Sequence, residues 1–226
     1  MTKASQSATP IISLVDVCKH YRDGDVQALD GVSMEILPGE FLSVMGPSGS
    51  GKSTLLNVVG ALDRPTSGTV SFRGQTIDRQ TNLDRLRSHE IGFVFQSFYL
   101  LPNLTARENV QIPMFQSDRS LGERVGEAER LLSLVSLQDR MDHLPKQLSN
   151  GQRQRVAIAR SLANGPSLVL ADEPTGALDS ESGVEVMELF KMLNDSRQTT
   201  LVIVTHDPAI AEKTKRTVCL RDGRLV

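Results

Sequence analysis

The stretch GPSGSGKST, residues 46–54, has the residue types and spacing that bind phosphate groups. It fits the pattern G-x-x-x-x-G-K-[ST], in which glycines let backbone N–H groups curl around β- and γ-phosphates without clashes from Cβ atoms. Lys52 supplies a positive charge, and the Ser53 hydroxyl can ligate Mg²⁺. The alternative is a tight turn that happens to contain a lysine, and the apolar strand before the loop and the helix after it argue against this. The candidate phosphate-binding residues are Gly46, Pro47, Ser48, Gly49, Ser50, Gly51, Lys52, Ser53 and Thr54.

Two acidic residues close a second apolar run, LVLADEP. Asp172 ends a predicted buried strand, where a carboxylate is unfavourable unless it meets a cation or hydrogen-bond donors. Mg²⁺, bound directly or through water, is the expected cation. Glu173 follows at the carboxyl edge of the strand, where ligand sites of α/β proteins lie, and could activate a water for in-line attack on a γ-phosphate. Alternatively, Glu173 is a solvated carboxylate that begins a loop.

Two further polar residues end predicted strands. His206 ends TLVIVTH and could hold the γ-phosphate or the attacking water; a lone histidine is otherwise a satisfied surface or core residue. Gln96 ends IGFVF and could bond a metal-bound or attacking water, and so report the state of the site to the segment that follows. Its alternative is an amide that merely begins a loop.

A second candidate anion contact lies at QLSNGQRQRVAIAR, residues 147–160. The pattern indicates the start of a helix, with Asn150 and Gly151 forming the turn before the helical run. Free backbone N–H groups and the positive end of the helix dipole suit such a start to an anion. Why one chain needs a second phosphate contact is not explained by either motif alone.

Alternating strands and helices position these residues. Continuous apolar runs at residues 41–45, 91–95, 167–172 and 199–206 predict parallel strands that are covered on both faces. Amphipathic patterns, such as LGERVGEAERLLSLVSL, predict helices between them, and Asp222-Gly223 predicts a terminal hairpin. Residues 97–160 lack convincing strands and therefore indicate a helical insertion. The pattern predicts an α/β fold with a mostly parallel sheet.

Composition narrows the class of protein. The 226 residues are 39% hydrophobic, enough for one large domain or one domain with an insertion, and the net charge of −2 gives no global attraction to nucleic acid. We see no apolar run near the ~20 residues that span a bilayer, and residues 1–10 form an expected flexible leader without a signal-peptide pattern. Two lone cysteines, Cys18 and Cys219, are expected to pack on strands. We therefore expect a reduced, cytoplasmic chain.

With these motifs in order, the chain resembles an ATP-binding cassette (ABC) ATPase, the nucleotide-binding subunit of an ABC transporter. The resemblance covers residues 11–226 and rests on GPSGSGKST (Walker A), VFQ (Q-loop), LSNGQ (signature), LVLADE (Walker B), ALD (D-loop) and THD (H-switch). It implies an ATP- and Mg²⁺-dependent ATPase whose adenine stacks on Tyr21, which by spacing alone could equally be a packing residue. It implies a RecA-like P-loop core with an antiparallel β subdomain at about 11–96 and 165–226, and a helical subdomain at about 97–164.

The resemblance also accounts for the second anion contact. In the family, two cassettes pack head to tail, and the signature helix of each caps the γ-phosphate held by the other. Ser149, Gly151 and Gln152 would therefore act on the second copy's ATP, and Asp179 would lie at the dimer seam. The commonest signature is L-S-G-G-Q; this chain has Asn150 at the third position, where we expect asparagine's tolerance of left-handed backbone to preserve the turn.

Further similarity indicates the lipoprotein-release and macrolide-export group, through SGSGKSTLLNVVGALDRPTSGTV, GFVFQSFYLLPNLTARENVQIP and LADEPTGALDS. It implies an integral membrane permease subunit that contacts exposed aromatic residues near Phe98, Tyr99, Leu100 and Leu101. The alternative for each of these residues is packing inside the helical insertion. The cassette would then lie peripherally on the cytoplasmic side of the inner membrane.

Two other classes of protein would carry different sequence patterns. A nucleic-acid-linked cassette would carry long coiled coils or tandem cassettes, and a GTPase would carry N-K-x-D; we find neither pattern in the sequence. A cassette that signals or gates without transport remains open.

Overall fold

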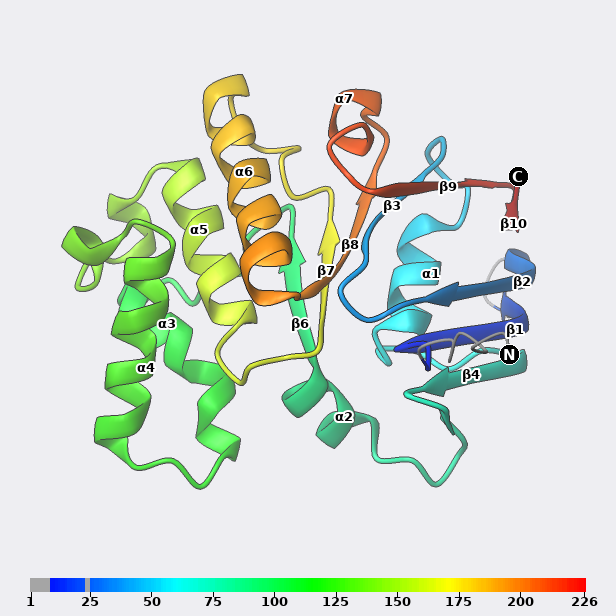
Figure 1. The fold of residues 1–226 in the computed structure, drawn as a ribbon, viewed down its shortest axis with the longest axis horizontal. Coiled ribbons are helices and arrows are strands. Elements are labelled where there is room, and N and C mark those ends of the chain that lie inside the picture. The colour runs from blue at the N-terminus through cyan, green and yellow to red at the C-terminus, as the bar shows by residue number, and fades with distance from the viewer. Residues whose placement is uncertain (1–8, 23–24) are drawn as a thin grey trace, which may run out of the picture.

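A mostly parallel six-stranded sheet forms the centre of the protein, with strand order β10-β9-β3-β8-β7-β6 (Figure 1). The computed structural model describes residues 9–22 and 25–226, so residues 1–8 of the expected leader lie outside the described residues. The strands of this sheet are β3 (Phe41–Met45), β6 (Ile91–Phe95), β7 (Leu168–Asp172), β8 (Thr200–Thr205), β9 (Arg216–Arg221) and β10 (Arg224–Leu225). The four predicted buried strands and the terminal hairpin, β9 with β10, are confirmed.

The carboxyl ends of the parallel strands meet at one edge of this sheet. Met45 pairs with Thr205, and Asp172 pairs with Phe95 on one side and Val204 on the other. The residues that follow these strand ends are therefore brought together by strand register alone.

A second sheet is antiparallel, in the order β2-β1-β4-β5. Its strands are β1 (Ile12–Tyr21), β2 (Val26–Ile36), β4 (Ser67–Phe72) and β5 (Gln75–Thr76). Tyr21 is the last residue of β1, which places it at the end of this sheet. Cys18 on β1 is half-buried, whereas Cys219 on β9 is an exposed thiol, so the packing expected for Cys219 is wrong.

Alternate residues of the central strands feed two separate hydrophobic cores, because successive side chains of a strand point to opposite faces. On β8, Leu201 and Ile203 join one core, and Val202 and Val204 join the other. The first core holds α5 and α6 against the sheet, and the second holds α1 and the antiparallel sheet. The central sheet thus lies between two layers (Figure 1).

Helices surround the sheets, and between β6 and β7 the described structure is helical. The helices are α1 (Lys52–Val59), α2 (Leu83–Glu90), α3 (Ala106–Gln111), α4 (Leu121–Leu134), α5 (Asn150–Ser161), α6 (Ser180–Arg197) and α7 (Pro208–Ala211), with short 3₁₀ turns at Ile112–Gln116, Gln138–Arg140 and Pro145–Gln147. Among the described residues, no helix combines the length and the apolar character needed to cross a membrane.

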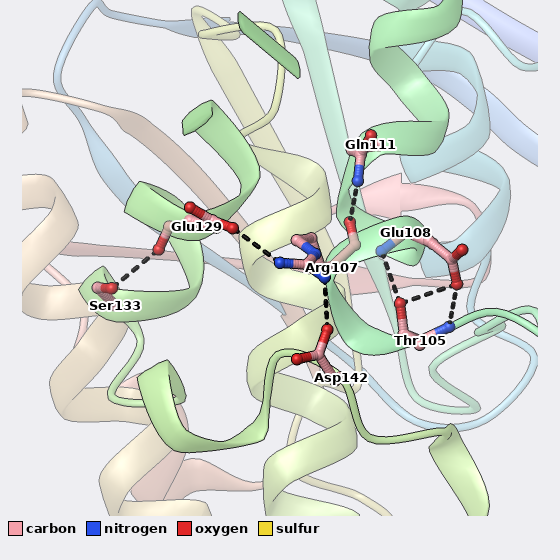
Figure 2. A network of polar contacts seen from close by, with 7 residues as sticks. All are labelled: Thr105, Arg107, Glu108, Gln111, Glu129, Ser133 and Asp142. Carbon is pink, nitrogen blue, oxygen red and sulfur yellow. Dashed lines mark hydrogen bonds and ion pairs between the residues drawn. The ribbon is translucent and has the colours of Figure 1, made fainter. Parts of the chain in front are cut away.

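Arg107 on α3 ties together the segments that precede α5 (Figure 2). Its guanidinium bonds Glu129 Oε1 on α4 at 2.8 Å and Asp142 Oδ1, in the segment before α5, at 2.5 Å. Its backbone N–H donates to Met141 O at 2.9 Å. These contacts raise the pKa of Arg107, the hydrogen bond to Glu129 contributing most. The chain leading to the start of α5 is therefore fixed to α3 and α4.

Candidate nucleotide-binding site

The phosphate loop connects β3 to α1, as the sequence predicts, and close contacts restrict two of its positions to glycine. A Cβ atom on Gly46 would lie 2.1 Å from Leu220 O. Gly51, which precedes the first helical residue, has φ +101°, and its Cβ would lie 2.3 Å from Ala28 O. Any side chain at either position would push the loop off β2 and β9.

The loop also carries polar groups suited to a phosphate. Lys52 Nζ donates to the carbonyl oxygens of Gly46 at 2.7 Å and Pro47 at 2.9 Å, so the ammonium lies over its own loop. The Ser50 hydroxyl is buried and has no hydrogen-bond partner among the described residues. A buried orphaned hydroxyl is costly, and an oxyanion held in the loop would satisfy it.

A pocket of about 470 Å³ opens beside the loop. Tyr21 forms part of its wall together with Lys52, Ser53 and Thr54, so the structure brings the predicted aromatic residue to the phosphate loop. Sequence reasoning missed several lining residues, which are Val26, Gln27, Ala28, Asp222 and Gly223. Only Asp222-Gly223 had a signal in the sequence, and it indicated a turn.

Tyr21 is held by a polar network. Its hydroxyl donates to Asp63 Oδ2 at 3.3 Å, and Lys19 Nζ bonds Asp63 Oδ1 at 2.7 Å while lying 5.0 Å from the tyrosine ring centroid. Burial raises the pKa of Asp63, but hydrogen bonds from Lys19, Arg64 and Tyr21 outweigh it and leave that pKa below its ordinary value. The Asp63 carboxylate therefore orients the aromatic wall.

Glu173 and His206 meet at the carboxyl edge of the sheet. His206 Nδ1 lies 2.7 Å from Glu173 Oε1, and the Thr205 hydroxyl donates to Glu173 Oε2 at 3.4 Å. Glu173 adopts φ +46°, a left-handed conformation that is rare for a non-glycine residue, and its N–H donates to Val204 O at 2.9 Å. Such strain collects at functional sites. Sequence reasoning missed the contact from Thr205.

Asp172 lies beside the start of α1 at the same edge. Burial raises the pKa of Asp172, the nearby Glu173 carboxylate raises it further, and the Ser53 hydroxyl and Lys52 ammonium oppose this only in part. Two crowded carboxylates with a hydroxyl nearby form a donor set that suits a hard cation such as Mg²⁺. No group of three or more His, Cys, Asp or Glu residues suited to a metal occurs in the described chain.

Gln96 is exposed, one residue beyond β6. Its amide faces Gly176, where an added Cβ would lie 2.8 Å from Gln96 Nε2. The structure thus places Gln96 against the loop that follows Glu173, and no hydrogen bond from it to Asp172 or Ser53 is present within the described residues.

Ser149 caps the start of α5. Its hydroxyl accepts from Gln152 N at 3.2 Å, and Gln152 Oε1 accepts from Ser149 N at 3.0 Å, which forms a capping box. Asn150 and Gly151 are the first two residues of the helix, and neither has positive φ. The expectation that Asn150 preserves a left-handed turn is therefore wrong, because the position has ordinary helical backbone.

The start of α5 packs against the start of α6. Asp179 is the N-cap of α6 and accepts from both the N–H and the hydroxyl of Ser182 at 2.9 Å. A Cβ on Gly151 would lie 2.8 Å from Ser182 Oγ, so the two helices approach closely at this glycine. The exposed Asp179 carboxylate has a pKa below its ordinary value because it accepts these bonds.

The site residues predicted from sequence therefore fall into two groups. Tyr21 and part of the phosphate loop line one pocket, and Asp172, Glu173, His206 and Gln96 lie at the adjoining strand ends. None of the second group lines that pocket; its members are Ser149, Gly151, Gln152 and Asp179.

The segment expected to contact a membrane subunit is only partly exposed. Phe98 is 8% exposed, and its ring lies 5.5 Å from the Arg153 guanidinium, so the expectation of an exposed Phe98 is wrong. Tyr99 is 64% and Leu101 45% exposed. Arg160, which sequence reasoning missed, donates to the carbonyl oxygens of Phe98 and Tyr99 at 2.7 and 2.6 Å.

A groove of about 290 Å³ lies next to this segment. Its walls include Phe93, Phe95, Ile112, Pro113 and Arg160. Phe93 and Phe95 stack with their centroids 5.7 Å apart, and Phe95 meets Tyr99 edge to face at 5.3 Å. An aromatic row therefore runs from the groove to the exposed Tyr99.

The chain is similar to known proteins in family, sequence and structure. A family profile described as ABC transporter matches residues 29–176. An uncharacterized ABC transporter ATP-binding protein of Thermotoga maritima is 51% identical, covering 95% of this chain and 93% of its own. The uncharacterized ABC transporter ATP-binding protein YknY of Bacillus subtilis is 49% identical, covering 96% and 95%.

Longer relatives and solved structures also match. The macrolide export ATP-binding/permease protein MacB of Marinobacter nauticus is 48% identical over 97% of this chain, which spans only 35% of that protein. The dimeric, post-hydrolysis structure of the ATP-binding cassette MJ0796 bound to ADP and Pi superposes with a TM-score of 0.86 at 45% identity, covering 95% of this chain and 96% of the other.

Proposed function

We propose that this chain, which belongs to the ABC transporter family and is an ATPase, works as a head-to-tail homodimer around two Mg-ATP molecules and drives a separate membrane permease. The observation that carries the proposal is the division of the site residues into two groups. Ser149 and the start of α5 do not line the pocket beside the phosphate loop, which supports the inference that they contact a phosphate held by a second copy.

The first group would bind and hydrolyse the nucleotide. When ATP phosphates occupy the loop, the Lys52 ammonium would bind them in place of the carbonyl oxygens of Gly46 and Pro47. The buried Ser50 hydroxyl would gain a phosphate oxygen as its hydrogen-bond partner. Tyr21 would stack on adenine. Ser53 and Asp172, with Gln96 through water, would hold Mg²⁺, which supplies positive charge to the β- and γ-phosphate oxygens.

Glu173 would accept the proton of the attacking water. Its carboxylate lies at the strand edge, and the contact of Oε1 with His206 Nδ1 orients it. The His206 side chain is 70% exposed and can turn toward the γ-phosphate when that group arrives. The Thr205 hydroxyl donates to the Glu173 carboxylate, and Glu173 N–H donates to Val204 O on β8; both bonds hold Glu173 in place.

The start of α5 would recognise the γ-phosphate of the partner's ATP. The Ser149 oxygen accepts from Gln152 N, which leaves the hydroxyl hydrogen free to donate to a phosphate oxygen. The backbone N–H groups of Asn150 and Gly151 lie in the first turn of α5. Helix geometry gives them no carbonyl oxygen within the helix to which they could donate. These contacts can form while ATP is bound and are lost when the γ-phosphate is released. They therefore favour the closed dimer only before hydrolysis. Asp179 would lie at the seam.

A permease would dock on the groove and the aromatic row beside it. We treat residues 97–164 as a helical subdomain on a core of residues 11–96 and 165–226, with this groove at the boundary. Exposed Tyr99 and Leu101 supply anchors. One relative is named a macrolide export ATP-binding/permease protein. This name favours a role for the chain in export, lipoprotein release or force transmission. The chain would lie peripherally on the cytoplasmic face of the membrane.

Gel filtration of catalytically arrested variants tests the dimer. Glu173→Gln should bind ATP and elute as a dimer only when ATP is present. In that background, Ser149→Asp retains an N-cap but sets a negative charge against the γ-phosphate, so the ATP-dependent dimer should be lost. Ser149→Asn, a neutral N-cap, is the matched control and should retain it. Equal dimerisation of the aspartate variant would refute the proposal.

A further inference from the structure

Asn150 is the residue that departs from the commonest signature sequence, and its side chain forms a hydrogen bond with the loop before α6. Its Nδ2 donates to Ala177 O at 3.0 Å, and its Oδ1 accepts from the Arg153 guanidinium at 2.5 Å. Because Arg153 can only donate, the contact fixes the amide with its nitrogen toward Ala177. A glycine at this position has no side chain to make either contact.

The loop between Glu173 and α6 is held by other side chains as well. Gln154, fully buried in the second turn of α5, donates to Pro174 O at 2.6 Å. The Gln96 amide packs on Gly176, and Gly151 contacts Ser182 on α6. The bond from Asn150 is the hydrogen bond that joins the first residue of α5 to the ALD sequence itself.

The same contacts continue toward the groove. Arg153, which bonds Asn150, lies over the ring of Phe98, and Phe98 O accepts from Arg160 in the groove wall. A continuous series of contacts therefore runs from the segment after Gln96, through Arg153 and Asn150, to Ala177. Such contiguous contacts can transmit a displacement, provided that their ends have two arrangements.

We propose that Asn150 is a positioning residue that makes the loop at Ala177 follow the start of α5, and that it thereby couples the two ATP sites of the dimer. This coupling rests on the proposed head-to-tail dimer. In that arrangement, α5 of one chain senses the partner's ATP, while Ala177 of the same chain continues the loop from its own Glu173. Engagement of one site would move the catalytic loop of the other.

Hydrogen exchange on the nucleotide-free chain tests the contact without the dimer. Asn150→Ala and Asn150→Asp should both speed exchange of amides 176–182 by about two- to tenfold, the factor expected for loss of one ordinary hydrogen bond. The aspartate keeps the acceptor for Arg153 and loses only the donor to Ala177. Amides of α4, far from the contact in sequence, serve as the internal control and should not change. Unchanged exchange at 176–182 in either variant would overturn the proposal.

Steady-state ATP hydrolysis tests the coupling. Asn150→Ala should bring the Hill coefficient for ATP from above one toward one, and Arg153→Ala should do so in part, because the amide of Asn150 loses its orientation. Binding of a fluorescent ATP analogue to the single chain should not change, since Asn150 does not line the pocket. Faster exchange with an unchanged Hill coefficient would refute the coupling. Failure of the dimer itself would instead appear as a monomeric Glu173→Gln variant in ATP, whatever the exchange result.

Discussion

Replacing Gly151 by alanine should destabilise the protein although the residue lies in a helix. Alanine is normally favoured over glycine in helix interiors by ~1 kcal/mol. Here the added Cβ would lie 2.8 Å from Ser182 Oγ and 3.0 Å from Ser182 Cβ. Ser182 cannot turn away freely, because its hydroxyl and its N–H both bond the Asp179 carboxylate.

The size of the effect follows from two opposing contributions. Overpacking a close contact costs about 1–3 kcal/mol, and the helix preference for alanine returns up to about 1 kcal/mol. We therefore expect a net loss of about 0–3 kcal/mol for Gly151→Ala. Gly126→Ala is the matched control: Gly126 lies in α4, and its added Cβ would meet nothing within 4 Å, so this variant should gain up to ~1 kcal/mol.

Urea denaturation of both variants without nucleotide measures the difference, and thermal melts should move by about 2–4 °C per kcal/mol for a chain of this size. Adding Ser182→Gly removes the opposing atoms, so the double-mutant cycle should give a coupling energy that favours the double variant. If Gly151→Ala stabilised the protein as much as Gly126→Ala does, close packing of α5 on α6 would be refuted.

Three further outcomes follow from the site. Lys52→Ala should abolish nucleotide binding and turnover, and retained turnover would contradict the phosphate-loop assignment. His206→Ala should bind ATP normally but lose most hydrolysis, because Glu173 loses its partner at 2.7 Å; full activity in a coupled-enzyme assay would make His206 a surface residue. Asp63 has a lowered pKa, so its stabilisation is present above its unfolded pKa and is lost as the pH falls through the lower folded value. Between pH 7 and about pH 3, Asp63→Asn should therefore lose less stability than the wild type, and equal losses in acid denaturation curves would contradict the Tyr21 network.

The fold was largely predictable because continuous apolar runs and a glycine-rich loop carry strong local signals. The four buried strands appeared as such runs, and their register places Asp172 beside the strand ends that precede Gln96 and His206. Local pattern also predicted the helix that became α5, although it placed Asn150 and Gly151 in a turn before the helix and did not identify Ser149 as the N-cap. Each of these features depends on residues that are close in sequence.

Tertiary contacts decided the remaining features. Asn150 was misread for a local reason instead: asparagine favours both turns and helix starts, and the S-x-x-Q capping box formed by Ser149 and Gln152 was overlooked. Phe98 was expected on the surface, but Arg153 from a distant part of the chain covers its ring. Gln154 and Asp63 had no sequence signal, because their roles depend on a carbonyl and a tyrosine brought near by folding.

The nucleotide pocket lies across the junction of the two sheets. Tyr21 and Val26 belong to the antiparallel sheet, while the phosphate loop extends from the central one. A molecule bound there would act as a staple between them, and at a concentration 1,000 times its dissociation constant it would add about 4 kcal/mol to the free energy of unfolding. When that molecule is absent, the free energy of unfolding would therefore fall by the same amount.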